Sequence, residues 1–427
     1  MKSQSRFKAA VAIGAVAALT ACSSPAPGLV KADGVQRVSV DRAAYAGELS
    51  AIRTSALKLG EALLADNGNG NVISSPGSLL IALAMLRTGA SGETAVEMDS
   101  VLGLPARDRD EAMNALLASL EKYDGDPGSV DENNPPRKPV MHAANGLFVD
   151  KNETTGAGYL ETLAKHYGTG VYPVDFRDEG ATKPSIDAWV DKNTGGRIKE
   201  APAQYSPDNT FSLLNAVYFA SAWRAPFDPN STADRPFTKA NGEEISVPTM
   251  QNELKMAYAD GAGWRAVDLP YADGFVMRLI LPDAGAGTSG DSARPGGAEL
   301  GEIANALESA QPVPVEIHLP KWDHKSNVDL IPILNKMGLS KTLGPSAEFD
   351  AIQPGLKITD AAQAANITVA EKGTIAAAVT QFNGAVSGKP IPLQVQKISF
   401  DRPFHYQIVH VESGLPLFMG KIADPRS

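Results

Sequence analysis

One uncharged stretch near the C-terminus constrains the fold of this chain more than any other feature. Residues 373–388, between Lys372 and Lys389, contain no charged side chain. The first half of the stretch is mainly Thr, Ala and Val, which are small or β-branched and suit a packed strand. The second half has the turn residues of a loop, including Asn383-Gly384. This segment is either an edge strand with a turn, or a loop that joins a sheet in a second state.

The composition indicates a globular protein. Of the 427 residues, 43% are hydrophobic and 21% are charged, which is enough for one large domain or two ordinary ones. The 49 acidic side chains exceed the 39 basic ones, and the formal net charge is -10. Because a negative surface repels a phosphate backbone, we expect no nucleic-acid partner.

The N-terminus has the parts of a secretory signal peptide. Three basic residues precede the apolar run 9–19, and small residues follow. The leader ends in Leu19-Thr20-Ala21-Cys22, which is similar to the lipobox of bacterial lipoproteins, where cleavage precedes a Cys that carries diacylglycerol. We therefore expect a lipoprotein signal peptide over 1–21 and a lipid on Cys22, the only cysteine of the chain. The alternative is an ordinary leader followed by a chance Cys.

The segment after the leader is rich in Ser, Pro, Ala and Gly. This composition predicts a flexible tether over residues 22–40, which would attach a single domain over 41–427 to the outer face of a bacterial cell membrane or envelope. The mature chain has no second thiol, so the core alone must hold the fold.

The rest of the chain predicts an α+β fold, with helices concentrated in the first half and strands in the second. Ser75 is expected to cap the helix that begins at Pro76. The acidic segment 124–139, which contains Pro and Gly, is a predicted surface loop, and segment 284–297 is a predicted low-complexity segment. Helices are expected over 45–64, 76–88, 91–102, 108–120, 155–167, 181–192 and 330–337. Strands are expected over 71–73, 141–150, 173–176, 212–219, 264–269, 275–281, 313–319, 367–369, 395–400, 404–411 and 417–422.

Motifs of enzymes are weak in this sequence. Ser55 and Lys58 match the S-x-x-K of penicillin-interacting enzymes, but no Ser-Asp-Asn or Lys-Thr-Gly triplet follows. Gly89-Ala90-Ser91-Gly92 misses the spacing of G-x-S-x-G. The six histidines are dispersed, and no pair has the spacing of metal ligands. We expect neither catalysis nor a metal or other cofactor.

Several segments taken together resemble the serpin family of serine protease inhibitors. They follow in the family's order between about Ser50 and Pro425. The resemblance implies three β-sheets with about nine helices, a monomer, and an exposed reactive-centre loop over about 371–395. The segments that carry it are 71–80, 82–86, 89–94, 189–198, 214–219 with Trp223 and Pro226-Phe227, 247–250, 318–321, 400–404 and 416–420.

The resemblance implies inhibition by insertion of a strand. In inhibitory members a serine protease attacks the loop and forms an acyl-enzyme, and the cut loop enters the large sheet and traps the protease, an established example of strand addition. Since side chains alternate along a strand, the hinge residues Thr374, Ala376, Ala378 and Thr380 would face the core, and all are small and uncharged. The alternative is a non-inhibitory binding or scaffold protein with the same fold.

Further positions follow from the resemblance. Gln363 stands where the family usually has His, so hydrogen bonding there is expected to differ. Ile375 occupies a hinge position that is usually acidic, and Asn366 needs a partner if it is buried. The hinge begins at Glu371 and Gly373. The residues that hold the large sheet together are expected to be Ser75, Ser78, Asn215, Trp223 and Gln363.

The expected target is an elastase-like or subtilisin-like serine protease. Family spacing from Glu371 places the scissile bond at Ser387-Gly388, with Val386 as an alternative, and small residues surround it. Phe382 would suit a chymotrypsin-like protease only with a much shorter loop. Lys389 precedes Pro390, which disfavours trypsin-like cleavage.

Overall fold

The computed structural model describes residues 25–65, 70–131, 133–203, 205–283, 295–374 and 395–427. Eight α-helices lie in these ranges, against the nine or so expected. They are α1 (Ala46–Ala65), α2 (Pro76–Thr88), α3 (Gly92–Leu102), α4 (Arg109–Glu121), α5 (Ala157–Thr162), α6 (Glu179–Asn193), α7 (Gly297–Ser309) and α8 (Ile331–Met337). Short 3-10 turns form η1 (Arg42–Tyr45), η2 (Pro127–Ser129) and η4 (Pro229–Ser231), and a π-turn forms η3 (Leu163–Tyr167).

The strands build the three sheets that were predicted. One sheet has the order β10-β11-β12-β4-β2-β3. The second runs β1-β15-β14-β8-β7-β6, and the third contains β5, β6, β9 and β13. The first six strands are β1 (Val72–Ser74), β2 (Val140–Asp150), β3 (Tyr172–Val174), β4 (Phe211–Ala222), β5 (Ala233–Thr238) and β6 (Glu244–Gly261). The others are β7 (Trp264–Pro270), β8 (Phe275–Pro282), β9 (Val313–Pro320), β10 (Trp322–Asp329), β11 (Asp360–Ala370), β12 (Gly373–Thr374), β13 (Gln396–Ser399), β14 (Phe404–His410) and β15 (Leu415–Ile422).

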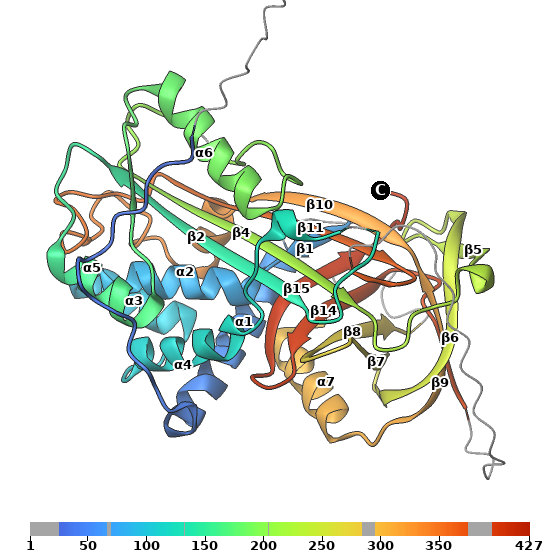
Figure 1. Cartoon of the computed structure of the whole chain (residues 1–427). Coiled ribbons are helices and arrows are strands. Elements are labelled where there is room, and N and C mark those ends of the chain that lie inside the picture. Colours follow the sequence, from blue (N-terminus) through green and yellow to red (C-terminus); the bar gives the residue numbers. More distant parts are fainter. Residues whose placement is uncertain (1–24, 66–69, 132, 204, 284–294, 375–394) are drawn as a thin grey trace, which may run out of the picture.

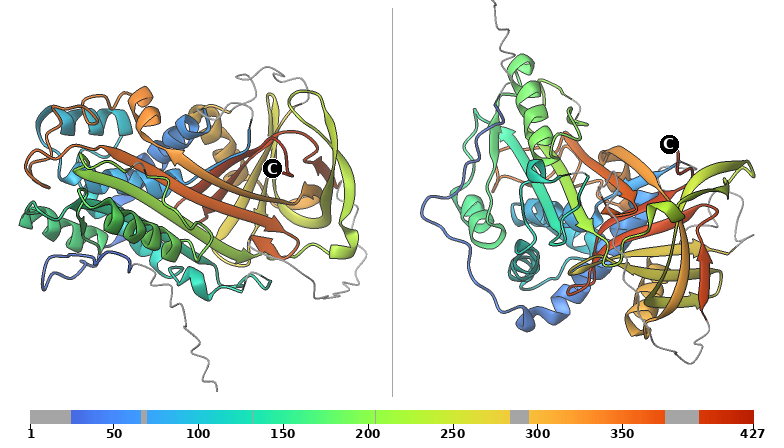
Figure 2. Two further views of the ribbon diagram at one scale, coloured as in Figure 1. Left: turned by 90° about the horizontal axis from the view of Figure 1, so that it is seen from above. Right: turned by 45° about the vertical axis from the view of Figure 1, so that its right-hand side comes forward.

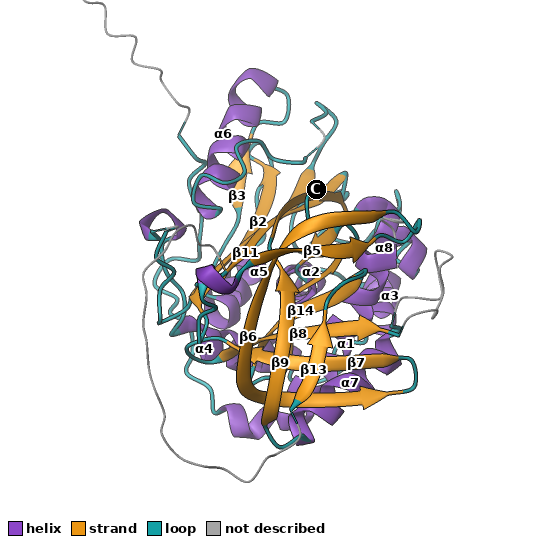
Figure 3. Cartoon of the chain, turned by 90° about the vertical axis from the view of Figure 1, so that its right-hand side faces the viewer, coloured by secondary structure: helices purple, strands orange, loops and turns teal. Residues whose placement is uncertain are grey.

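The long strand β6 joins the second and third sheets. Its first part pairs with β5 and β9, and its last residues, from Ala257, pair with β7. In Figure 3, β6, β9 and β13 run alongside one another, and β7 and β8 run across their direction. The six-stranded sheet lies between α6 on one face and α2 on the other (Figure 1). The hydrophobic core fills the space between the sheets and α2.

Every predicted helix and strand is present within one to three residues, except that β11 is longer than the predicted 367–369. Its alanines have low strand propensity, and burial of the whole strand outweighs that preference. Five elements were missed, namely β5, β6, β10, β12 and α7. Strands β5, β6 and β10 expose many polar side chains, so their periodicity is weak.

Ser75 does not cap α2 as predicted. It occupies the residue before the helix, but its hydroxyl makes no hydrogen bond to the first turn. The hydroxyl donates to the carbonyl of Leu417 in β15 instead. The side chain therefore ties α2 to the second sheet.

The described part of the predicted tether, residues 25–40, contacts the domain. Val30 forms a β-bridge with Val171, and Arg37 donates to the side chain of Asn114. Composition alone missed this contact because it depends on a few specific partners rather than on a hydrophobic pattern. The predicted signal peptide lies outside the described residues.

Candidate functional site

The six-stranded sheet is closed at one end and open at the other. In the closed half, residues 360–365 of β11 pair directly and in parallel with residues 212–217 of β4. Beyond that point the two strands separate, and β12 fills the gap, antiparallel to both. The hinge therefore starts as a short strand that is already part of the sheet.

A tight turn at Glu371 and Lys372 carries the chain from β11 into β12. The carbonyl of Glu371 accepts a hydrogen bond from the Phe227 N–H at 2.9 Å, and that of Lys372 accepts one from the Trp223 N–H at 2.8 Å. A Cβ atom at Gly373 would lie 2.1 Å from the carbonyl oxygen of Ser221. Only glycine fits there, because the two backbones approach so closely.

The Glu371 side chain fixes the turn to the third sheet. Its carboxylate lies 3.0 Å from Lys321 Nζ and accepts a hydrogen bond from Thr232 Oγ1 at 3.0 Å. Burial alone would raise the pKa of Glu371, but the backbone amide, Lys321 and Thr232 outweigh it and lower this pKa below its ordinary value. The carboxylate is thus held in its charged form.

Thr374 points into the core between the sheets. Its side chain is 1% exposed, and its hydroxyl shares a hydrogen bond with Tyr271. The Tyr271 ring stacks on Trp223, with centroids 4.4 Å apart, and Trp223 Nε1 donates to the Ala370 carbonyl at 2.9 Å. Burial raises the pKa of Tyr271, so its hydroxyl stays protonated. The rings of Tyr271 and Trp223 pack beneath the open end of the sheet.

Amide side chains hold the closed end together. Gln363 Oε1 accepts from the Ser75 N–H at 2.7 Å, while Nε2 donates to the Ser75 carbonyl at 3.0 Å and to Asn215 Oδ1 at 2.6 Å. Asn215 Nδ2 in turn donates to Ser78 Oγ at 2.7 Å and to Asn145 Oδ1 at 2.6 Å. Gln363 is 0% exposed. A planar amide satisfies both backbone groups of one residue, which explains how Gln serves where the resemblance expects His.

The predicted residues thus form two groups. Ser75, Ser78, Asn215 and Gln363 meet at the closed end, whereas Trp223, Glu371, Gly373 and Thr374 meet at the open end. Eight residues of chain separate Asn215 from Trp223, which is roughly 26 Å along a strand. The remaining predicted positions lie outside the described residues, namely Cys22, Ile375, Ala376, Ala378, Thr380, Val386, Ser387 and Gly388.

Four further residues belong to these groups and were not predicted. Lys321 and Thr232 hold Glu371, Tyr271 contacts Thr374, and Asn145 extends the amide cluster into β2. Lys321 lies in the recognised segment 318–321 and could have been paired with Glu371 by charge. Tyr271 and Asn145 carry no signal in the sequence, since only the fold brings them close.

Asn366 has the partner that its burial requires. Its Oδ1 accepts from Arg197 Nη1 at 2.9 Å, and its Nδ2 donates to the His324 carbonyl at 3.2 Å.

The S-x-x-K match has no catalytic geometry. Ser55 Oγ donates to the carbonyl of Gly103 at 2.8 Å, and Lys58 Nζ donates to that of Val101 at 3.0 Å.

No group of three or more potential ligands among the described residues could hold a metal ion. A helix with the length and apolar character needed to cross a bilayer is likewise not found in the described part of the chain.

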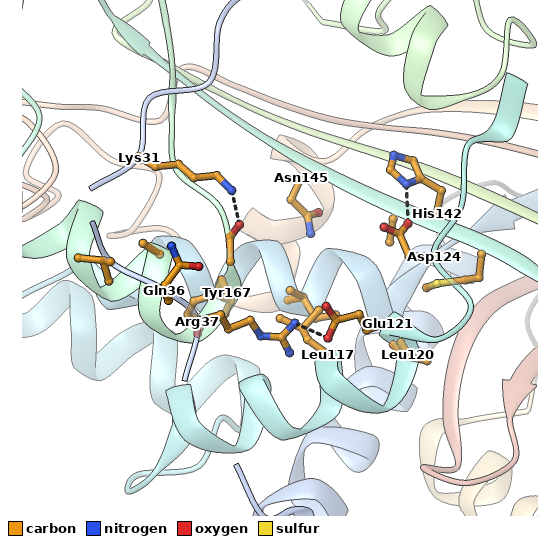
Figure 4. Close-up of a pocket in the computed structure, with 16 residues that line it drawn as sticks. Lys31, Gln36, Arg37, Leu117, Leu120, Glu121, Asp124, His142, Asn145 and Tyr167 are labelled. Carbon is orange, nitrogen blue, oxygen red and sulfur yellow. Dashed lines mark hydrogen bonds and ion pairs between the residues drawn. The ribbon is translucent and has the colours of Figure 1, made fainter. Parts of the chain in front are cut away.

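A cavity of about 460 Å³ lies between residues 31–37, α4, η3 and β2 (Figure 4). Arg37 is paired with Glu121 and His142 with Asp124 at this cavity, and Lys31 donates to the Gly168 carbonyl.

Comparison with known proteins identifies the family. Residues 50–425 match the family described as Serpin (serine protease inhibitor). The chain belongs to the serpin family. Serpins are generally inhibitors rather than catalytic enzymes.

Relatives and solved structures agree with this assignment. The serpin is 32% identical over 370 residues to an uncharacterized serpin-like protein of Thermococcus kodakarensis, covering 85% of this chain and 82% of the relative. It is 30% identical over 378 residues to a serine protease inhibitor of Cyanea capillata, covering 87% and 96% of the two chains. The native structure of the thermophilic serpin tengpin superposes with a TM-score of 0.79 at 22% identity, covering 93% of this chain and 100% of that one. The superposition on tengpin shows that the two chains share a fold.

Proposed function

We propose that this serpin is a suicide-substrate inhibitor of a serine protease. The observation that carries the proposal is the position of Gly373 and Thr374, which already pair with both β11 and β4. Cleavage of the loop after this point would free the following residues to extend β12 down the sheet. The trapped acyl-enzyme would be carried along with the new strand.

The register of β12 identifies what the extended strand would meet. Thr374 lies opposite Ser221 of β4 and Val369 of β11. Six residues further along, the same register brings Thr380 between Asn215 and Gln363, which now face each other directly. A threonine hydroxyl can accept from Gln363 Nε2 and donate to Asn215 Oδ1, so insertion would replace their bond rather than leave two buried amides unpaired.

The side chains beside the proposed position of the extended β12 also favour insertion. β11 contributes four buried alanines, Ala361, Ala362, Ala364 and Ala365. On the inserting side, Ala376 and Ala378 would face the core at the positions between Thr374 and Thr380. Small side chains on both strands allow a new strand to enter without large rearrangement of the core.

The proposed target is an elastase-like or subtilisin-like serine protease that cuts at Ser387-Gly388 or after Val386. We further propose a monomer exported by the signal peptide of residues 1–21 and anchored by a lipid on Cys22 to the outer face of a bacterial cell membrane or envelope. These details rest on the sequence patterns described above.

A protease panel tests the inhibitory function. Elastase, subtilisin, chymotrypsin and trypsin are each mixed with the serpin, and the products are separated on a denaturing gel and mapped by mass. The proposal predicts a covalent complex that survives boiling, with the cut near residue 387. Cleavage by all four proteases without a complex would instead favour the non-inhibitory alternative, a binding or scaffold protein.

The anchor has a separate test. The mass of the mature chain should include diacylglycerol on Cys22, and Cys22→Ala should release the protein from membranes. An unmodified N-terminal peptide in the membrane fraction would contradict the proposed anchor.

A further inference from the structure

Residues 25–38, the N-terminal strap, lie in a fixed position on the domain. Val30 and Val171 exchange both backbone hydrogen bonds, at 2.8 and 3.0 Å. At Gly170 a Cβ atom would lie 1.9 Å from the Val30 carbonyl oxygen. The strap and the chain before β3 therefore touch backbone to backbone.

A buried asparagine on α4 fastens the other end of the strap. Asn114 is 0% exposed. Its Oδ1 accepts from Arg37 Nε at 2.6 Å, and its Nδ2 donates to the Val38 carbonyl at 2.8 Å. Arg37 Nη2 also donates to the Asn114 carbonyl at 2.8 Å. Undocking of the strap would leave these polar groups without partners, which opposes its release.

The first described residue of the strap contacts α6. The carbonyl of Pro25 accepts a hydrogen bond from Ser185 Oγ at 3.0 Å. Cys22 precedes Pro25 by three residues in the sequence, and an extended chain covers at most about 3.6 Å per residue, so this link can reach at most roughly 11 Å. A lipid on Cys22 would therefore be held close to α6.

The strap and the hinge lie toward opposite ends of the six-stranded sheet. Val171 immediately precedes β3, in which Tyr172 pairs with Phe148, and Phe148 pairs with Ser212 at the start of β4. The hinge pairs with Ser221 near the end of β4. Nine residues of strand correspond to roughly 30 Å, several times the reach of the link to Cys22. Figures 1 and 2 show α6 at one extremity of the molecule, away from β9 and β13.

We propose that α6 with the adjoining strap is a membrane-facing surface, whose partner is the lipid bilayer that holds Cys22, and that the hinge end points away from the bilayer. This inference rests on the lipid anchor of the proposed function. The short link and the docked strap together prevent the domain from turning its hinge toward the membrane. The reactive-centre loop would then be presented to proteases in the surrounding solution rather than to proteases within the membrane.

A vesicle assay tests this orientation. The chain without residues 1–21 has Cys22 as its only thiol, which is coupled to a maleimide lipid in phosphatidylcholine–phosphatidylglycerol vesicles. A fluorescent amino acid replaces either Lys183, exposed on α6, or Arg224, exposed beside the hinge. With nitroxide on the lipid headgroups, quenching at position 183 should exceed quenching at position 224 at least threefold. Equal quenching, or stronger quenching at 224, would overturn the proposal.

Variants of the strap sharpen the assay. Gly170→Ala places a methyl group against the Val30 carbonyl, and Arg37→Ala removes the bonds to Asn114, so either change should reduce the difference between the two labels. Gly158→Ala is the matched control, since a Cβ there meets nothing within 4 Å. A difference that persists in both strap variants would contradict the docked strap as its cause. Because the vesicles supply the lipid, absence of natural lipid on Cys22 would refute the anchor without affecting this result.

Discussion

The two ends of the six-stranded sheet differ in what holds them. At the open end, the two residues of β12 separate β11 from β4 and rest on Trp223 and Tyr271. At the closed end, the same two strands pair directly, and buried amides of Gln363 and Asn215 join them to α2. At the open end, an inserting strand would pack against aromatic rings. At the closed end, the buried amides would have to exchange hydrogen-bond partners. In the proposed mechanism, the open end would set whether strand insertion begins, and the closed end would set the free-energy cost of completing it.

The largest effect is expected from Thr374→Arg. Position 374 is already buried against Tyr271 in the intact chain, and burying an unpaired charge there costs several kcal/mol. The substitution should therefore displace β12 and remove the start of the new strand. We expect the variant to be cut by the target protease as a plain substrate, with almost no covalent complex on a denaturing gel. Thr374→Ser, which keeps the hydroxyl, is the control and should form complex normally. An undiminished yield of complex from the Arg variant would argue against insertion.

The second effect tests the closed end through Gln363→Leu. The substitution keeps the volume but leaves both backbone groups of Ser75 and the Asn215 Oδ1 without this partner. At about 1–3 kcal/mol for a buried unpaired group, the free energy of unfolding should fall by about 3 kcal/mol. Urea unfolding measures it, with Gln311→Leu on the surface as the matched control. Equal stability of the two variants would mean that the amide cluster does not hold the sheet.

A smaller, pH-dependent effect is expected from Glu371→Gln. The carboxylate has a lowered pKa in the folded chain, so its contribution is present above its ordinary pKa and is lost as the pH falls through the folded value. Lys321 is partly exposed, which limits the loss at pH 7 to about 1 kcal/mol. Urea unfolding of the wild type and the variant should differ at pH 7 and converge at acid pH. A gap that is constant with pH would contradict the ion pair.

The smallest effect concerns the bridge between β2 and α6. Both ring nitrogens of His142 face acceptors, Asp124 Oδ1 at 2.8 Å and Asn193 Oδ1 at 2.9 Å. Burial lowers the pKa of His142, but Asp124 and Asn193, with the nearby charge of Asp126, outweigh it and raise this pKa above its ordinary value. The stabilisation is thus present below the ordinary pKa and is lost as the pH rises through the folded value.

Substitution of His142 tests the direction of this pH dependence of stability. In His142→Gln the melting temperature should lose the part of its pH dependence that lies above pH 6, a change worth less than about 1 kcal/mol. Asp124→Asn should remove the same dependence. If the two variants keep the wild-type profile, the bridge does not titrate in this range.

The contrast between the two ends also shows what the sequence can predict. The periodicity of the helices and the apolar run of β4 follow local rules, and they were predicted from the sequence. The grouping of Gln363 with Ser75 joins positions 288 residues apart in the chain, and it was expected only through the family resemblance. Tyr271 beneath Thr374 depends on the finished fold and was not predicted. The docked strap was missed for the same reason, since its partner Asn114 looks like any polar residue on a helix.

The most direct test of strand insertion is the melting temperature of the serpin before and after a single cut in the reactive-centre loop. The account predicts that the cut chain melts well above the intact one, because a new central strand adds backbone hydrogen bonds on both sides, and that the Thr374→Arg chain shows no such rise. An unchanged or lower melting temperature of the cut wild-type chain would contradict insertion between β11 and β4.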